Sequence, residues 1–183
     1  TVIIITGIID DLVEISPRMK LLGIVIGALI IYYVADIRMD LVTLPLIGEI
    51  QLGVFSLPIT LLWILAITNA VNLIDGLDGL ATGVSIIALT TMGIIGFFFL
   101  TIDDVVVPIM IFTLVAAAAG FLPYNFFPAR IFLGDTGALF LGFMISIMSL
   151  QGLKNATLIT VIIPVVILGI PITDTVAAIL RRR

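Results

Sequence analysis

Residues 54–79 read VFSLPITLLWILAITNAVNLIDGLDG, and this stretch decides the fold class. No charged side chain occurs in residues 54–74. About 20 such residues are enough to cross the roughly 30 Å hydrocarbon core of a bilayer. Two Asp-Gly steps follow in residues 75–79, and they favour a turn. The stretch therefore predicts a membrane-spanning helix that ends in an acidic turn.

The composition of the whole chain supports a membrane protein. Hydrophobic residues make up 62% of the 183 residues and charged residues 11%, against about 45–50% and about 25% in soluble domains. A soluble enzyme and a disordered chain are thereby excluded. The net charge of −4, without a basic tract before the C-terminus, argues against nucleic acid as a partner. Because the chain lacks Cys and His, disulfides, thiolate metal sites and imidazole chemistry are excluded as well.

Hydropathy predicts an all-α, polytopic helix bundle in the lipid bilayer. We expect a partial span at 1–9 and about six full spans near 20–35, 54–74, 80–100, 105–123, 137–150 and 156–180. The connection 36–53 suggests a small hairpin or a re-entrant piece. Both ends of the chain look cut, so we expect residues 1–183 to form one transmembrane core of a longer protein.

Basic residues indicate the orientation. If the chain crosses at each predicted span, the segments 10–20, 75–79, 124–136 and 181–183 lie on one side of the membrane. This side carries Arg18, Lys20, Arg130 and the three terminal arginines, and the other side carries only Arg38 and Lys154. Loops rich in Lys and Arg stay in the cytoplasm, so this side is predicted to be cytoplasmic.

Two clusters of polar residues fall on the predicted cytoplasmic side. In the first, Asp10 and Asp11 close the first span, Ser16-Pro17 is typical of a helix start, and Lys20 lies in the first turn of the new helix. This group could hold Mg²⁺ and phosphate. The second cluster consists of polar residues that recur every three positions and therefore share one face of a helix. A capped helix end alone would not explain the two amides, because they lie within an apolar span. The members of this cluster are Asn69, Asn72, Asp75 and Asp78.

The third cluster is residues 124–137, YNFFPARIFLGDTG. Its aromatic residues fit an interfacial belt, but an exposed Phe could also stack on a base, and Arg130 is a candidate substrate-binding residue. Backbone N–H groups at the helix start near Asp135 would favour phosphate. Carboxylates, amides and two cations without His or Cys suit Mg²⁺, with Mn²⁺ as an alternative, acting on phosphates.

These motifs resemble the polyprenyl-phosphate N-acetylhexosamine-1-phosphate transferases of glycosyltransferase family 4. The resemblance rests on NAVNLIDGLDGLATG (69–83), NFFPARIFLGDTGALFLG (125–142) and the spacing of Asp10-Asp11 from Lys20. The sequences of these motifs are most similar to those of bacterial enzymes that transfer GlcNAc-1-phosphate from UDP-GlcNAc to undecaprenyl phosphate. Those enzymes begin the synthesis of teichoic acid, O-antigen and related glycans. The resemblance implies a multi-pass protein of the bacterial cell membrane with its active site facing the cytoplasm. Related enzymes suggest a homodimer.

The resemblance also implies roles for the acidic residues and the lysine. Asp10 and Asp11 would be an essential acidic pair that organises metal and lysine, with a role as general base ranked second. Lys20 would contact the pyrophosphate. Asp135 would be the main Mg²⁺ ligand, with Asn72 beside it.

The remaining implied roles concern the nucleotide. Phe132 would stack on uracil and Asp78 would hydrogen-bond to it, while Asp75 and Asn69 would lie in the same pocket. Members of the family also have earlier helices with a Gly-rich motif and a later His-rich loop, and this chain contains neither. We therefore expect the 183 residues alone to be inactive or severely impaired.

Three alternatives stay open on the sequence. A sister enzyme transfers phospho-MurNAc-pentapeptide, but it usually has Thr where this chain has Ile74. An ion-coupled transporter would also need intramembrane carboxylates, yet it should place them near the bilayer midplane. An inactive scaffold would not explain so many costly polar groups at one membrane face.

Overall fold

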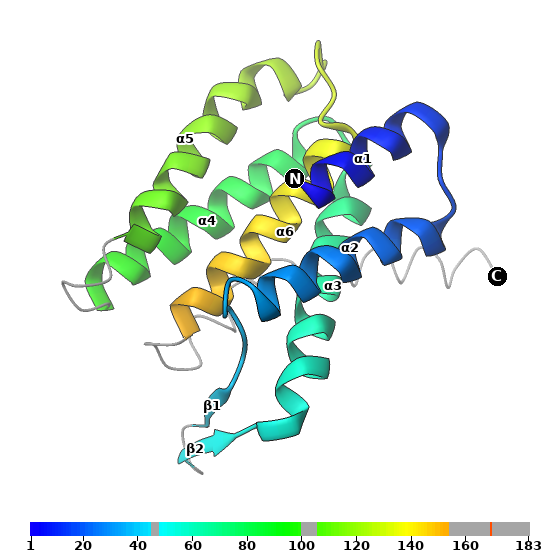
Figure 1. Ribbon diagram of the computed structural model, residues 1–183. Helices are drawn as coiled ribbons and strands as arrows, with labels where there is room; N and C mark the ends of the chain where they lie inside the picture. The colour runs from blue at the N-terminus through cyan, green and yellow to red at the C-terminus, as the bar shows by residue number, and fades with distance from the viewer. Residues whose placement is uncertain (45–47, 100–105, 154–168, 170–183) are drawn as a thin grey trace.

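Apolar runs without charge form helices here, because a helix satisfies its own backbone hydrogen bonds where water is absent. The computed structural model describes residues 1–44, 48–99, 106–153 and 169, and the predicted span 156–180 lies almost entirely outside them. The described ranges contain six α-helices (Figure 1). They are α1 (Val2–Val13), α2 (Pro17–Tyr33), α3 (Ser56–Ile74), α4 (Leu80–Phe99), α5 (Val106–Asn125) and α6 (Gly134–Leu153).

A β-hairpin joins α2 to α3, as the sequence suggested for this connection, and the rest of the described fold is mainly helical, as predicted. Strands β1 (Leu41–Leu44) and β2 (Gly48–Gln51) pair antiparallel, with Leu41 opposite Gln51. A short 3₁₀ turn, Gly53–Phe55, leads into α3. Two hydrogen bonds to α3 hold the chain before β1, from the Ser56 hydroxyl to Asp40 (2.9 Å) and from the Met39 N–H to Thr60 (3.0 Å).

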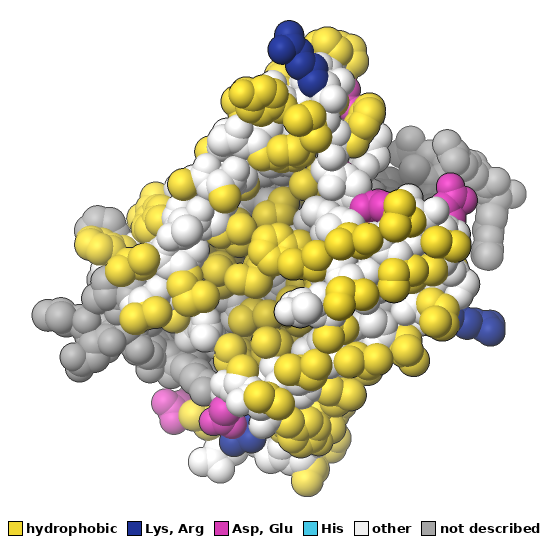
Figure 2. Space-filling view, turned by 45° about the horizontal axis from the view of Figure 1, so that its top comes forward, with side chains coloured by type: hydrophobic (Ala, Val, Ile, Leu, Met, Phe, Trp, Pro, Cys, Tyr) yellow, Lys and Arg dark blue, Asp and Glu magenta, His cyan; other side chains and the backbone are white. Residues whose placement is uncertain are grey.

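Three helical segments of the described part are long and apolar enough to cross a membrane, and they are Gly53–Ile74, Leu80–Phe97 and Val106–Asn125. The expected six full spans are therefore not supported. At 12 residues α1 is too short for a full span, and the 17 residues of α2 lie at the lower limit of the range of about 17–25 residues. Figure 2 shows hydrophobic side chains over much of the visible surface, with few charged side chains among them. Such a surface suits contact with lipid.

Helix α6 lies in the middle of the bundle and packs against α1, α3 and α4 (Figure 1). Its contact with α3 is close at Gly142, where a Cβ atom would lie 2.8 Å from the Thr68 Cα and 3.0 Å from the Thr68 carbonyl oxygen. Small residues let helix backbones approach in this way within membranes. This packing fixes the end of α3 beside the beginning of α6.

We expect Gly142→Ala to lower the free energy of unfolding by about 1–3 kcal/mol, because its methyl group would meet backbone atoms that cannot move aside. Gly120→Ala is the matched control, since a Cβ atom there meets nothing within 4 Å. The control should unfold at the wild-type temperature or slightly above it. Thermal unfolding in detergent measures both, and equal midpoints for the two variants would contradict the tight α3–α6 packing.

Candidate active site

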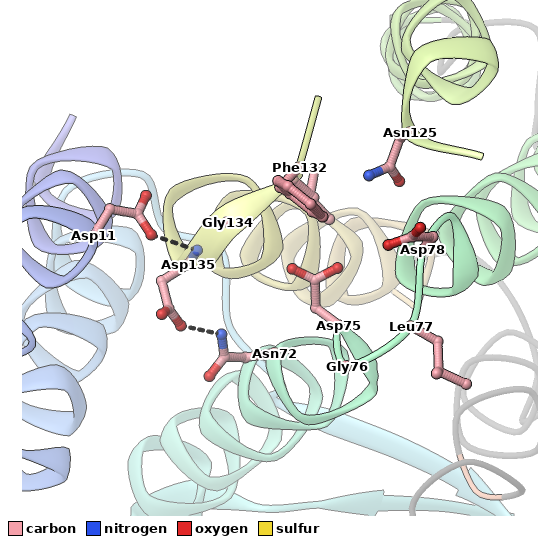
Figure 3. Close-up of a pocket in the computed structure, with 11 residues that line it drawn as sticks. Asp11, Asn72, Asp75, Gly76, Leu77, Asp78, Asn125, Phe132, Gly134 and Asp135 are labelled. Carbon is pink, nitrogen blue, oxygen red and sulfur yellow. Dashed lines mark hydrogen bonds between the residues drawn. The ribbon is translucent and has the colours of Figure 1, made fainter. Parts of the chain in front are cut away.

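The polar stretches meet at one end of the bundle. A cavity of about 380 Å³ opens where α3 ends and α6 begins, beside the end of α1. Figure 3 shows Asp11 and Asp135 on one side, Asp78 and Asn125 on the other, and Asp75 and Phe132 between them. The cavity is lined by Asp11, Asn72, Asp75, Gly76, Leu77, Asp78, Asn125, Phe132, Leu133, Gly134 and Asp135. The three predicted clusters thus lie together.

The Asp135 carboxylate is the point at which several elements join. Its Oδ1 accepts hydrogen bonds from the Lys20 ammonium (2.7 Å) and from the Asn72 amide (2.5 Å). Lys20 also forms an ion pair with Asp10, which is only 6% exposed. Asp10 in turn accepts a hydrogen bond from the Ile15 N–H (3.0 Å), within the turn between α1 and α2. One carboxylate and one ammonium therefore connect α1, α2, α3 and α6.

The side chain of Asp11, which belongs to α1, lies at the start of α6. Its Oδ1 accepts the Asp135 N–H (2.8 Å), and its Oδ2 accepts the Thr136 N–H (3.1 Å) and the Thr136 hydroxyl. The sequence led us to expect phosphate at these N–H groups, and the structure corrects this expectation. A carboxylate of the protein already fills the position that the helix N-terminus offers to an anion.

The negative charges of the cavity act on one another. Asp75 follows the last residue of α3, and burial, together with the charges of Asp135 and Asp11, raises its pKa to about 6. Burial would also raise the pKa of Asp135, which lies in the first turn of α6. The hydrogen bonds from Lys20 and Asn72 outweigh burial there and lower that pKa. The cavity is thus an environment in which a cation would be stabilised.

The oxygen ligands of the cavity suit a hard cation. No three acidic side chains of the described residues lie close enough together to hold a metal ion by themselves. Magnesium needs no such cage, because it keeps several waters and usually takes one or two carboxylates together with phosphates of a substrate. Asp135 offers one carboxylate, and Asn72, whose amide N–H donates to that carboxylate, carries an amide oxygen beside it. This pair fits that requirement.

The loop between α5 and α6 covers the other side of the cavity. Asp78 accepts the Ala129 N–H (3.0 Å), so one of its oxygens holds the loop. Asn125 accepts the Thr82 hydroxyl (2.8 Å) and donates to the Ile131 carbonyl (3.1 Å). Phe132 is 74% exposed at the cavity and is free to contact a ligand.

Four predicted site residues do not line the cavity. Asp10 and Lys20 are connected to it through Asp135, whereas Asn69 and Arg130 are not. The Asn69 amide donates to the Leu65 carbonyl of its own helix (2.8 Å), because Asn69 lies about one turn before Asn72, farther from the end of α3. Arg130 is exposed on the α5–α6 loop and is absent from the lining. Conversely, sequence reasoning missed Asn125 as a site residue. The signal was an amide at the end of an apolar run, comparable to the amides within an apolar span that identified Asn72.

The amino-acid sequence also matches a known protein family. A family described as glycosyl transferase family 4 matches residues 1–153. The chain belongs to glycosyl transferase family 4. The resemblance drawn from the motifs is therefore confirmed.

Individual relatives of the chain give a finer comparison. The chain is 47% identical over 99% of its length to a probable undecaprenyl-phosphate N-acetylglucosaminyl 1-phosphate transferase of Bacillus subtilis, covering 50% of that protein. It is 35% identical over 96% of its length to a phospho-N-acetylmuramoyl-pentapeptide-transferase of Clostridium beijerinckii, covering 55% of it. A protein of the same description from Listeria monocytogenes is 36% identical over 79% of the chain, with 47% of its own length covered. The chain spans about half the length of these relatives.

The raised pKa of Asp75 predicts a pH-dependent stability. A carboxyl whose pKa is higher in the folded state than its ordinary value of 3.8 makes folding less favourable once it ionises, so this contribution worsens between about pH 4 and pH 6. We expect Asp75→Asn to unfold at a higher temperature than wild type at pH 8, in the presence of a chelator, with a smaller difference at pH 4.5. Thermal unfolding at both pH values measures this. A difference independent of pH would contradict it.

Proposed function

We propose that the protein carrying this chain transfers GlcNAc-1-phosphate from UDP-GlcNAc to undecaprenyl phosphate. The products are undecaprenyl-diphospho-GlcNAc and UMP. The supporting observation is that the acidic pair, the amide–carboxylate pair and the aromatic loop meet at a single cavity. The 47% identity to the Bacillus subtilis transferase favours GlcNAc as the donor sugar over MurNAc-pentapeptide, for whose transferases the identities are 34–36%.

The chemistry is the exchange of one phosphoanhydride for another. A phosphate oxygen of the lipid attacks the β-phosphorus of UDP-GlcNAc, the bond from this phosphorus to the bridging oxygen breaks, and UMP leaves with that oxygen. One such bond forms as one breaks, so the reaction is nearly balanced. Catalysis then depends mainly on positioning and on neutralising charge.

The residues of the cavity divide this work. Asp135 and Asn72 would hold Mg²⁺, which when bound neutralises phosphate oxygens as charge moves between them. Lys20, fixed between Asp10 and Asp135, supplies a second positive charge. Phe132 would stack on uracil, and Asp78 would accept a hydrogen bond from the base.

A strong general base is unnecessary in this scheme. The second pKa of a phosphate monoester is about 6, so most of the lipid phosphate has lost its proton at neutral pH. Asp10 is buried against Lys20, which suits a role in holding the ammonium in place. We assign Asp10 to that role.

The site would face the cytoplasm. Arg18, Lys20 and Arg130 lie at or beyond the helix ends on the side of the cavity, whereas Arg38 lies before the hairpin at the other end of α2. This distribution agrees with cytoplasmic retention of basic loops. It also disfavours an ion-coupled transporter, whose ionisable residues would lie near the midplane.

The decisive assay is Mg²⁺-dependent release of UMP by the full-length protein from UDP-GlcNAc and undecaprenyl phosphate, with UDP-MurNAc-pentapeptide as the competing donor. We expect release with UDP-GlcNAc, and a loss of about 100-fold or more in kcat for Asp135→Asn, because it removes a charge that faces the transferred phosphates. Glu49→Gln, the same acid-to-amide change on the exposed hairpin, should keep the wild-type rate. Release from the MurNAc donor alone would identify the sister activity instead.

A second assay examines the aromatic loop. Phe132→Ala should raise the KM for UDP-GlcNAc by about tenfold, since stacking on a base contributes about 1–3 kcal/mol, while Phe132→Tyr should stay close to wild type. Phe127→Ala is the matched control, because Phe127 is 75% exposed on the same loop and does not line the cavity. Equal effects of Phe132→Ala and Phe127→Ala on KM would argue against stacking.

A further inference from the structure

Helix α6 lacks a capping side chain from its own segment. The first N–H groups of any helix have no partner within it, and Ser, Thr, Asp or Asn just before the helix usually accepts them. Residues 132–134 are Phe, Leu and Gly, and none of them has a side-chain oxygen. The first turn of α6, which carries Asp135, therefore depends on an acceptor from elsewhere.

Asp11 is that acceptor, although it lies 124 residues earlier in the chain than Asp135. Its two oxygens receive three donors from α6: the N–H groups of Asp135 and Thr136 and the Thr136 hydroxyl. A carboxylate at this position is also stabilised by the helix dipole. Asp11 thus caps α6 from α1.

Two glycines make room for this cap. Gly134 has a φ of +67°, and a Cβ atom there would lie 3.1 Å from both oxygens of Asp11. Gly7 lies one turn before Asp11 on α1, and a Cβ atom there would lie 2.4 Å from the Thr136 Cα. The backbone of α1 therefore lies directly against the first turn of α6.

The adjacent acids consequently have different partners. Asp10 faces Lys20, whose ammonium reaches the Asp135 carboxylate, and Asp11 holds the Asp135 peptide. We propose that Asp11 is a positioning residue of the transferase, which caps α6 and thereby fixes the direction of the Asp135 side chain. This inference rests on the proposed function for its effect on catalysis, whereas the cap itself can be tested without substrate.

Hydrogen–deuterium exchange in the ligand-free, full-length protein tests the cap. We expect the amides of Asp135 and Thr136 to exchange about tenfold faster or more in Asp11→Asn, because an amide side chain has one acceptor oxygen where the carboxylate has two. Asp75→Asn is the matched control, since it changes an acid in the same cavity that makes no hydrogen bond to α6 in the described residues. Unchanged exchange in Asp11→Asn would overturn the proposal.

Activity tests whether the cap positions Asp135. Thr136→Val removes the hydroxyl that donates to Asp11 and keeps both acids, so it should lower kcat several-fold without changing the pH–rate profile, and Thr136→Ser should restore kcat. Combining Thr136→Val with Asp11→Asn should cost less than the product of the single losses. A wild-type kcat for Thr136→Val beside an inactive Asp11→Asn would show that Asp11 acts directly on substrate, and so would loss of one limb of the pH–rate profile in Asp11→Asn.

The failures of the two proposals are distinguishable. If the wild-type protein releases no UMP from either donor, the proposed function fails, and the exchange measurement still decides whether Asp11 caps α6. If the protein releases UMP but exchange at α6 does not depend on Asp11, the positioning role fails and the proposed function stands.

Discussion

The site depends on one carboxylate being held from several directions. Asp135 receives Lys20 and Asn72 on its side chain and Asp11 on its peptide, so four helices converge on a single residue. A buried or half-buried carboxylate is costly unless it is paired, and here the pairing groups come from α2 and α3, while α1 holds the peptide of the same residue. The same contacts therefore stabilise the fold and arrange the cavity. This explains why the residues expected to act on phosphates are also the ones that hold the helix ends together.

Much of this arrangement could be predicted from the sequence. The apolar runs predicted where α3, α4 and α5 lie, because uncharged stretches of about 20 residues have few alternatives to a helix in a membrane. The three-residue spacing of Asn72, Asp75 and Asp78 correctly predicted that they would gather at the end of α3. Their proximity to Asp11 and Asp135 was predicted because the chain crosses the membrane at each successive span. Segments that are distant in the sequence thereby return to the same side of the membrane.

Other features depend on contacts that periodicity does not reveal. Asn69 shares the spacing of its neighbours, yet it bonds within its own helix, because a single turn along α3 separates it from the cavity. The start of α6 has the glycine and dipole of an anion site, but Asp11 fills it, and only the three-dimensional approach of α1 shows this. The bounds of α1 and α2 were also displaced from the predicted segments 1–9 and 20–35, since both helices extend into polar residues near the turn that joins them, which hydropathy does not mark as helical.

The α5–α6 loop is fastened through its main chain, by Asp78 at the Ala129 N–H and by Asn125 at the Ile131 carbonyl. Main-chain groups are the same for nearly every amino acid. The outward-facing side chains of this loop can therefore be exchanged during evolution while its path stays constant. Such an anchorage lets one scaffold acquire new recognition chemistry at the rim of its cavity without rebuilding the interior.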